Sequence, residues 1–256
     1  MDKIIKIKNN RIDGSLYHYA HFICDCLFPE IINEFYNYSE VIREKNLLQT
    51  LGNFTKIYTE VMQIKNTEIN KKEYDSLKIN TINYKNKESY CDEIYFDKFR
   101  NYIFTRYNIN PDIFNIDYPE IILIKRYSRI ELIDDIDLKK NNKNITTGKE
   151  RREINNIDLL DTYLKNKYNT KFKSLYLEQL PFEEQVKYFN NAKLIICAHG
   201  AGMANLFFCK HNTKVIEVVC NTYWNFFDII SKILKLNHIK CNINSFEHII
   251  KLIEIN

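Results

Sequence analysis

The stretch that decides the fold runs from Leu194 to Phe208 and reads Leu-Ile-Ile-Cys-Ala-His-Gly-Ala-Gly-Met-Ala-Asn-Leu-Phe-Phe. The apolar run 194–198 is typical of a buried parallel strand. Gly200 and Gly202, two of only five glycines in the chain, follow at once and predict a tight turn, after which residues 204–208 open a helix. Such a turn lies at the carboxyl end of a parallel strand, where open α/β sheets bind ligands.

The glycine turn has the chemistry of an anion site. Glycines let the backbone approach a ligand closely, and the amides at the start of the next helix suit a diphosphate. His199 stands at the edge of the turn, where its ring can donate to a phosphate or a sugar hydroxyl. The spacing matches neither the dinucleotide fingerprint nor the phosphate loop of nucleotide hydrolases. A plain strand-to-helix connection with a neighbouring histidine is the alternative.

Strands alternate with helices over most of the chain, which indicates parallel sheets in an α/β protein. We place a domain boundary near Tyr118-Pro119, with a less regular α/β domain at 1–118 and a Rossmann-like domain at 119–256. Short strand-like pieces at 56–58 and 93–96 make the first domain hard to interpret. The expected strands are 3–8, 121–124, 173–177, 194–198, 214–219 and 239–242, and the expected helices are 16–36 with a kink or break at Pro29, 97–107, 157–168, 181–190, 204–208, 224–236 and 246–253.

Composition narrows the class of protein. Of the 256 residues, 45% are hydrophobic and 27% are charged, as in soluble globular proteins. The net charge of +4 comes from mixed charges and gives no basic stripe for nucleic acid. No run approaches the roughly 20 apolar residues that span a bilayer, and no signal peptide is evident. We therefore expect a cytoplasmic protein with reduced cysteines and no zinc site. Its abundant Lys, Asn and Ile suggest an AT-rich genome, such as that of a parasite, an AT-rich bacterium or a large DNA virus of the giant-virus kind.

Several motifs occur together around the glycine turn. Glu184-Gln185 lies within the helix-like segment 180–190, the apolar strand follows, and then come residues 199–202 and Asn205. This order resembles the signature of glycosyltransferase family 61, which includes plant xylan xylosyl- and arabinosyltransferases and animal protein O-linked N-acetylglucosaminyltransferases. The resemblance is strong over 119–236.

Other segments extend the resemblance. An apolar strand ends in Lys125-Arg126, and an Arg-x-Ile-x-Asn motif begins at Arg152. Near the N-terminus, residues 21–29 carry a histidine, an aromatic residue, an aspartate four positions after the histidine, and a proline. The strand ending at Glu217 matches the strand after the glycine turn. Residues 40–115 do not align with the family pattern.

The resemblance implies a GT-B-like fold of two Rossmann-like halves, whose parallel sheets are flanked by helices. The C-terminal half is expected to hold the nucleotide sugar, and the acceptor is expected in the cleft. The implied reaction is inverting transfer of GlcNAc, or of a pentose such as xylose, from a UDP-sugar to a hydroxyl of a glycan or protein. No cofactor is expected, and the sequence leaves a homodimer open.

The resemblance also assigns roles. Arg126 and Arg152 are expected to clamp the diphosphate in place of a metal, because arginine pairs with phosphate oxygens and keeps its charge. Arg129 and Arg151 are near neighbours that can take the same role. His21 and Asp25 form a pair for removing the acceptor proton, or a structural link; His18 is a weaker candidate. The remaining expected donor-binding residues are Glu178 and Glu217 for the ribose, the turn His199, Gly200, Ala201 and Gly202, and Asn205.

Departures from the family pattern keep alternatives open. Lys125 stands where Ser or Ala is usual, and Asn156 stands where an acid is expected. A catalytically degenerate module that holds a glycan or nucleotide is therefore the main alternative, with an unrelated α/β hydrolase as a third. The acidic run 134–137 lies in a loop-like stretch, 134–150, and is interpreted as solvated rather than as a metal ligand. Trp224 and Tyr223 either belong to the core or stack on a ligand, and His211, His238 and His248 are assigned to surface or core.

Overall fold

The chain forms two compact units in the computed structural model, which describes residues 3–8, 14–46, 48–127, 152–220 and 224–255. Unit 1 spans Met1–Ile109 and unit 2 spans Asn110–Asn256. The boundary expected at Tyr118-Pro119 thus falls inside unit 2. The segment before it is held there by Asn191, whose Oδ1 accepts from the Asn115 amide at 2.7 Å and whose Nδ2 donates to the Tyr118 carbonyl at 2.8 Å.

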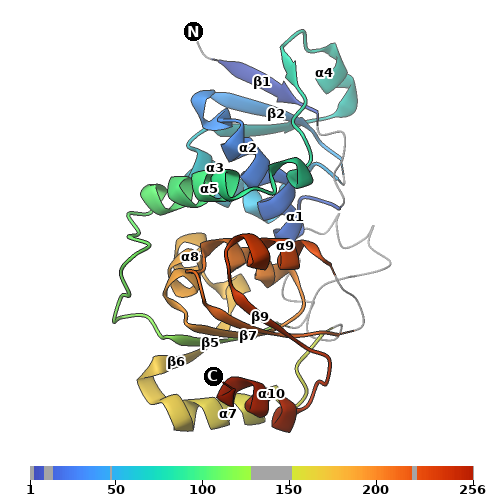
Figure 1. Ribbon diagram of the computed structural model, residues 1–256. Helices are drawn as coiled ribbons and strands as arrows, with labels where there is room; N and C mark the ends of the chain where they lie inside the picture. Colours follow the sequence, from blue (N-terminus) through green and yellow to red (C-terminus); the bar gives the residue numbers. More distant parts are fainter. Residues whose placement is uncertain (1–2, 9–13, 47, 128–151, 221–223, 256) are drawn as a thin grey trace. The chain divides into compact units, whose positions relative to one another are not determined.

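Unit 1 contains a parallel sheet of strand order β3-β2-β1-β4. Its strands β1 and β2 are labelled in Figure 1. In this order the chain runs to one side of β1 for β2 and β3 and returns to its other side for β4, as in the first half of a Rossmann fold. Its strands are β1 Ile4–Ile7, β2 Glu40–Glu44, β3 Lys65–Ile69 and β4 Thr81–Ile82; its helices are α1 Tyr19–His21, η1 Phe22–Leu27, α2 Phe28–Ile32, η2 Phe35–Asn37, η3 Gly52–Phe54, α3 Thr55–Met62, α4 Lys71–Ser76, η4 Lys87–Tyr90 and α5 Glu93–Arg106.

The long apolar segment after β1 is helical, as predicted, but over 19–32 rather than 16–36. Its middle part, η1, is a π-helix, a rare form that is frequently found at functional sites. Pro29 does not break the helix. It lies in the first turn of α2, where a missing N–H costs least, and its carbonyl accepts from the Asn33 amide at 3.0 Å.

Two strand-like pieces of unit 1 are helical instead. Residues 56–58 lie in α3, and residues 93–96 open α5. Burial explains the helical form of both segments, because each helix places an aromatic side chain in the core: Tyr58 from α3 and Phe96 from α5. Phe28 of α2 meets the α5 rings of Phe96 and Phe99 edge to face, with ring centroids 5.3 and 5.2 Å apart. A short alternation of apolar and polar residues in the sequence does not reveal such contacts between distant segments.

Unit 2 contains a five-stranded parallel sheet of order β6-β5-β7-β8-β9. Figure 1 shows α7 and α10 on one face and α8 and α9 on the other. The strands are β5 Ile121–Lys125, β6 Phe172–Tyr176, β7 Leu194–Ala198, β8 Lys214–Val218 and β9 Asn237–Cys241; the helices are α7 Ile157–Tyr168, η6 Asn169–Lys171, η7 Leu177–Gln179, α8 Phe182–Asn191, η8 Ala201–Phe208, α9 Phe226–Ile233 and α10 Phe246–Glu254.

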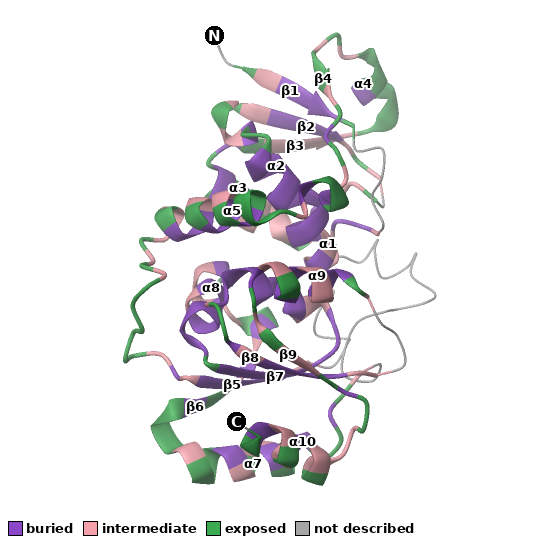
Figure 2. Ribbon diagram, viewed as in Figure 1, coloured by how far each residue is buried: buried purple, intermediate pink, exposed green. Residues whose placement is uncertain are grey.

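Side chains along the central strands of unit 2 point alternately to the two faces of the sheet, so that each face has its own hydrophobic core. Leu194, Ile196 and Ala198 face the α7 and α10 side, while Ile195 and Cys197 are buried on the other face. Because both faces are covered, β5, β7 and β8 are almost wholly buried, as Figure 2 shows, and they read in the sequence as continuous apolar runs. The predicted α/β class, with two parallel sheets flanked by helices, is confirmed and is consistent with a GT-B-like fold of two domains.

Some sequence predictions lie outside the described residues. They concern Arg129, Arg151, Tyr223, the acidic run 134–137 and the loop-like stretch 134–150.

Candidate functional site

The strand order of unit 2 fixes where a ligand is expected. From β5 the chain first forms β6 on one side and later β7 on the other, so the connections leave β5 and β7 in opposite directions. Ligands of open α/β sheets bind beyond the carboxyl ends of the strands at such a switch point. Arg126 follows β5 directly, and the His199-Gly200 dipeptide follows β7. The glycine turn therefore lies at the switch point.

Arg126 packs against Gly200. A methyl group at Gly200 would lie 3.0 Å from Arg126 Nη2 and 3.2 Å from its Cζ, so the guanidinium lies against the glycine backbone. The φ angle of Gly200 is 164°, an extended value that any residue adopts. Glycine is thus needed here for the room it leaves to the arginine, and not for its backbone freedom.

Arg152, 26 positions after Arg126 in the sequence, contacts the same dipeptide. Its Nη1 donates to the His199 carbonyl at 3.2 Å. Burial raises the pKa of the nearby Cys220 thiol, while the positive charges of Arg152 and Arg126 oppose that rise. Both charges thus act at the carboxyl ends of β7 and β8, and the structure brings together the two arginines that the sequence singled out.

Helix η8 is a 3-10 helix that begins at Ala201, within the turn, whereas the sequence predicted that the helix opens over 204–208. The amides of Ala201 and Gly202 precede its first hydrogen bond, which the Met203 amide donates to the Gly200 carbonyl at 2.9 Å. The first amides of a helix have no acceptor within it, and they carry partial positive charge. Two guanidinium groups and these amides therefore concentrate positive charge at one turn.

Both ring nitrogens of His199 form hydrogen bonds inside the protein. Its Nδ1 donates to Glu217 Oε1, and its Nε2 accepts from the Trp224 amide at 3.1 Å. Only 1% of the side chain is exposed. This geometry argues against the expected donation from His199 to a phosphate or sugar and assigns the ring to holding the turn. Trp224 packs on Phe227 with ring centroids 4.9 Å apart, which favours its structural interpretation.

Glu217 also directs its polar atoms to partners inside the protein. The fully buried carboxylate has Oε1 on His199 and Oε2 2.8 Å from His238 Nε2. Burial favours its neutral form, but the hydrogen bond with His199 and the close contact with His238 outweigh burial and lower the pKa of Glu217 from 4.5 to about 2. Because both oxygens are occupied, the expected ribose contact does not fit Glu217, which instead anchors His199.

Glu178 remains suited to a ligand. It lies in η7, directly beyond β6, and its side chain is exposed. The surrounding protein limits its hydration and raises its pKa, while the positive charge of Arg126 lowers it. An exposed carboxylate within the field of Arg126 can accept hydrogen bonds from ribose hydroxyls.

Gln185 and Asn205 brace the turn. Gln185 Nε2 donates to the carbonyls of Leu177 and Leu180 at 3.0 and 3.1 Å, and its Oε1 accepts from Asn205 Nδ2 at 3.0 Å. A methyl group at Gly202 would lie 2.7 Å from Leu177 Cδ1, so η7 and η8 touch at this glycine. Gln185 of the Glu-Gln pair and the asparagine of the motif thus fix η7, α8 and η8 to one another.

In unit 1, His21 and Asp25 form the pair that the sequence predicted. His21 Nδ1 lies 2.6 Å from Asp25 Oδ2, and Lys87 Nζ donates to Asp25 Oδ1 at 2.7 Å. Tyr84, which follows β4, donates its hydroxyl to the Asp25 carbonyl at 2.9 Å. The pair therefore joins the helical segment after β1 to the chain after β4, at the switch point of this sheet. His18 lies beside it, with ring centroids 6.2 Å from His21.

The two members of the pair differ in access. The side chain of Asp25 is 1% exposed and that of Lys87 is 0% exposed, whereas His21 is 21% exposed. Sequence reasoning missed Lys87 and Tyr84, because their segment gave no recognisable pattern. A lysine among asparagines and glutamates looks like a surface residue until the fold buries it.

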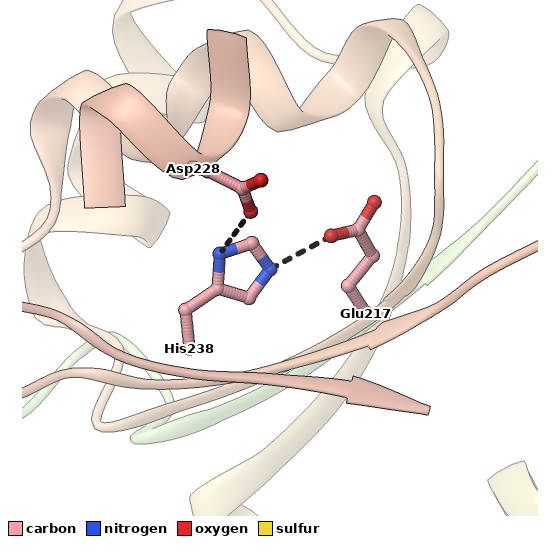
Figure 3. Close-up of side chains that lie close together, drawn as sticks. All are labelled: Glu217, Asp228 and His238. Carbon is pink, nitrogen blue, oxygen red and sulfur yellow. Dashed lines mark ion pairs between the residues drawn. The ribbon is translucent and has the colours of Figure 1, made fainter. Parts of the chain in front are cut away.

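Figure 3 shows a second group that the sequence missed, formed by Glu217, Asp228 and His238. Their ligand-type atoms lie within 4.8 Å of one another, as metal-binding groups do. However, His238 turns Nε2 to Glu217 and Nδ1 to Asp228, 3.8 Å away, and Lys240 Nζ lies 2.7 Å from Asp228. The imidazole thus stands between two carboxylates, one of which already pairs with a lysine, and this arrangement fits an ionic chain better than a cation site.

Comparison with known families agrees with this geometry. The family model described as Glycosyltransferase 61 matches residues 19–216, which is most of the chain. The chain belongs to glycosyltransferase family 61. The family match takes in both the His21–Asp25 pair of unit 1 and the glycine turn of unit 2, and the resemblance inferred from the motifs is confirmed. The protein is therefore a glycosyltransferase, whose partners are a sugar donor and an acceptor.

Two further findings concern this member of family 61. A search among curated proteins found no match to the chain. None of the described helices combines the length and the apolar character needed to cross a bilayer.

Proposed function

We propose that this glycosyltransferase binds a UDP-sugar at the glycine turn of unit 2 and transfers the sugar, with inversion, to a hydroxyl of a glycan or protein. The observation that carries the proposal is the meeting of Arg126 and Arg152 on the His199-Gly200 dipeptide at the topological switch point. A nucleoside diphosphate is the leaving group of such a transfer, and its developing negative charge needs preorganised positive partners.

In this proposal the two guanidinium groups and the amides of Ala201 and Gly202 stabilise the departing diphosphate without a metal ion. Arginine is suited to this task, because its planar group forms paired hydrogen bonds with phosphate oxygens. Glu178 accepts from the ribose hydroxyls. GlcNAc and a pentose such as xylose are the sugars proposed, in line with the activities that the resemblance implies.

We further propose that His21 takes the proton of the acceptor hydroxyl. The burial of Asp25 and the engagement of both its oxygens by His21 and Lys87 suit it to orienting the imidazole. A carboxylate bound to Nδ1 fixes the tautomer in which Nε2 accepts a proton. Asp25 is thus a positioning residue, and His21 is the base.

The departure at Asn156 has a backbone reason that weakens the degenerate-module alternative. Asn156 adopts φ 55° directly before α7, a left-handed conformation that asparagine tolerates better than glutamate does. The neighbouring Asn155 amide donates to Asn244 Oδ1 at 2.8 Å. The asparagine therefore serves the start of α7, and its presence does not require the loss of a catalytic acid.

Nucleotide release from a panel of UDP-, GDP- and dTDP-sugars, each offered with hydroxyl acceptors, tests the proposal. We expect UDP release and sugar transfer by the wild type, and a loss of transfer activity of at least about a hundredfold in Arg152→Ala. Arg106→Gln, a change on α5 of unit 1, is the control and should keep full activity. Donor binding with neither transfer nor hydrolysis for any donor would support the degenerate module instead.

A further inference from the structure

Gly14, in the segment between β1 and α1, lies against the imidazole of His21 in unit 1. A methyl group at Gly14 would lie 2.5 Å from Cδ2 and 2.7 Å from Cε1 of the imidazole, and closer still to its Nε2. Carbon atoms in normal contact lie about 3.5–4.0 Å apart. The half of the ring that carries Nε2 thus occupies the space that any other residue at position 14 would fill with its Cβ.

The backbone conformation of Gly14 does not itself require glycine. Of the described glycines, Gly52 has a positive φ, 53°, whereas the φ of Gly14 lies outside the left-handed region. Residues with a Cβ adopt such a backbone without strain. An alanine therefore fits the backbone at position 14, and its methyl group conflicts with the ring of His21.

The chain directly after this glycine is anchored, so the ring gives way more easily than the backbone. The Leu16 amide donates to the Leu48 carbonyl at 3.0 Å, and the Ser15 carbonyl accepts from the His18 amide at 2.9 Å. Ser15 and Leu16 are both buried. A shift of the backbone would break these hydrogen bonds, whereas the His21 ring can turn about its side-chain bonds.

On its other side the ring meets a carboxylate that cannot follow it. Asp25 Oδ2 lies 2.6 Å from His21 Nδ1, and Asp25 Oδ1 accepts from Lys87 Nζ at 2.7 Å. The Tyr84 hydroxyl donates to the Asp25 carbonyl at 2.9 Å, and the Asp25 side chain is only 1% exposed. An imidazole displaced by a larger residue at position 14 would therefore lose its contact with Asp25.

We propose that Gly14 is a positioning residue for sugar transfer, because the room left by its missing side chain keeps the His21 imidazole on Asp25. Its part in catalysis rests on the proposed function, in which His21 is the base, whereas the packing of Gly14 on His21 does not. A base acts only within hydrogen-bond reach of the proton that it takes, and a displacement of about 1 Å can cost about a hundredfold in rate.

Chemical denaturation of the intact protein tests the packing without any ligand. We expect Gly14→Ala to lower the denaturation midpoint of the wild type and to leave that of His21→Ala unchanged, because the ring that the methyl group meets is then gone. If Gly14→Ala alone does not fold, the double variant with His21→Ala should fold. Equal losses in the two backgrounds, or a double variant that does not fold although His21→Ala does, would overturn the packing.

Transfer kinetics with UDP-N-acetylglucosamine, or with the panel sugar that the wild type uses, test the positioning role. In Gly14→Ala, kcat should fall about a hundredfold. Its affinity for UDP, measured by calorimetry, should stay at the wild-type value, because the proposed donor site lies in unit 2. A wild-type kcat in Gly14→Ala, or a UDP affinity that falls together with kcat, would overturn the role.

Gly52→Ala is the matched control in unit 1, because its positive φ makes alanine strained there. It should lower the denaturation midpoint and keep the wild-type kcat, which separates a loss of stability from a displaced base. Full activity in His21→Ala, or no transfer by the wild type, would count against the proposed function. The denaturation result would still decide whether Gly14 packs on His21.

Discussion

Gly200 shows how one missing side chain makes room for a charged one. The Arg126 guanidinium occupies the space beside its Cα, so we expect Gly200→Ala to displace the arginine while the extended backbone remains unstrained. Loss of one good arginine contact with a phosphate corresponds to about a tenfold weaker affinity for UDP. Titration calorimetry checks the affinity. Unchanged UDP binding in Gly200→Ala would show that Arg126 has no part in the site.

Gly202→Ala is the matched comparison, because its added methyl group meets Leu177 rather than an arginine. Overpacking of this kind costs about 1–3 kcal/mol of the free energy of unfolding. Chemical denaturation should therefore separate the two variants, with the stability loss in Gly202→Ala and the affinity loss in Gly200→Ala.

Glu217 makes the stability of unit 2 depend on pH in the acidic range. Its pKa is about 2 in the folded protein and about 4.5 when unfolded, so its contribution is complete above pH 4.5 and is lost as pH falls towards 2. The shift corresponds to about 3 kcal/mol at neutral pH. Denaturation from pH 7 to pH 3 should show Glu217→Gln losing less stability than the wild type across this window. Parallel curves for the two proteins would contradict this account of Glu217.

At the scale of elements, three helical segments are fixed by a single amide side chain. Gln185 binds the carbonyl of Leu177, which opens η7, the carbonyl of Leu180, which follows η7, and the Asn205 side chain of η8; Gln185 and Asn205 are both buried. We expect Gln185→Leu to destabilise the protein by about 2–4 kcal/mol, since it leaves buried polar groups unpaired. A double-mutant cycle with Asn205→Ala should give a coupling of about 1 kcal/mol or more, and strict additivity would refute the brace.

Elements of unit 2 are predictable because their pattern has a local cause. Strands buried on both faces read as apolar runs, and the glycine pair marks the turn after β7. Unit 1 is less predictable, since the helical character of residues 56–58 comes from burial of Tyr58 against distant residues. The same limit applies to the site. The sequence indicated Arg126 and Arg152 by motif, but the pairing of Glu217 with His238 depends on strand β9, which is remote in sequence and fixed only by the sheet.

At the scale of the whole molecule, each unit carries its own buried ionic centre. In unit 1 the fully buried Glu30 accepts from Arg43 at 2.8 Å and from Tyr58 at 2.7 Å, and Arg43 also donates to Asn66 at 2.8 Å. These contacts tie α2 to β2, α3 and β3. Unit 1 thus has a polar core that shares no residue with the ionic chain of unit 2.

Glu30→Gln should therefore destabilise unit 1 by about 3–5 kcal/mol, because it leaves the Arg43 charge buried without its partner. Hydrogen exchange should show faster exchange in unit 1, while the core strands β5, β7 and β8 of unit 2 keep their protection. Equal loss of protection in both units would mean that they unfold as one, and that the division at Ile109 has no energetic meaning.

The central claim is that two arginines and a glycine turn hold the donor diphosphate, and the binding of UDP in the presence of EDTA tests it most directly. We expect the wild type to bind UDP under these conditions, Arg126→Ala and Arg152→Ala each to bind about ten- to a hundredfold more weakly, and Arg106→Gln to bind as the wild type does. Equal affinity in all four proteins, or wild-type binding that disappears with EDTA, would contradict it.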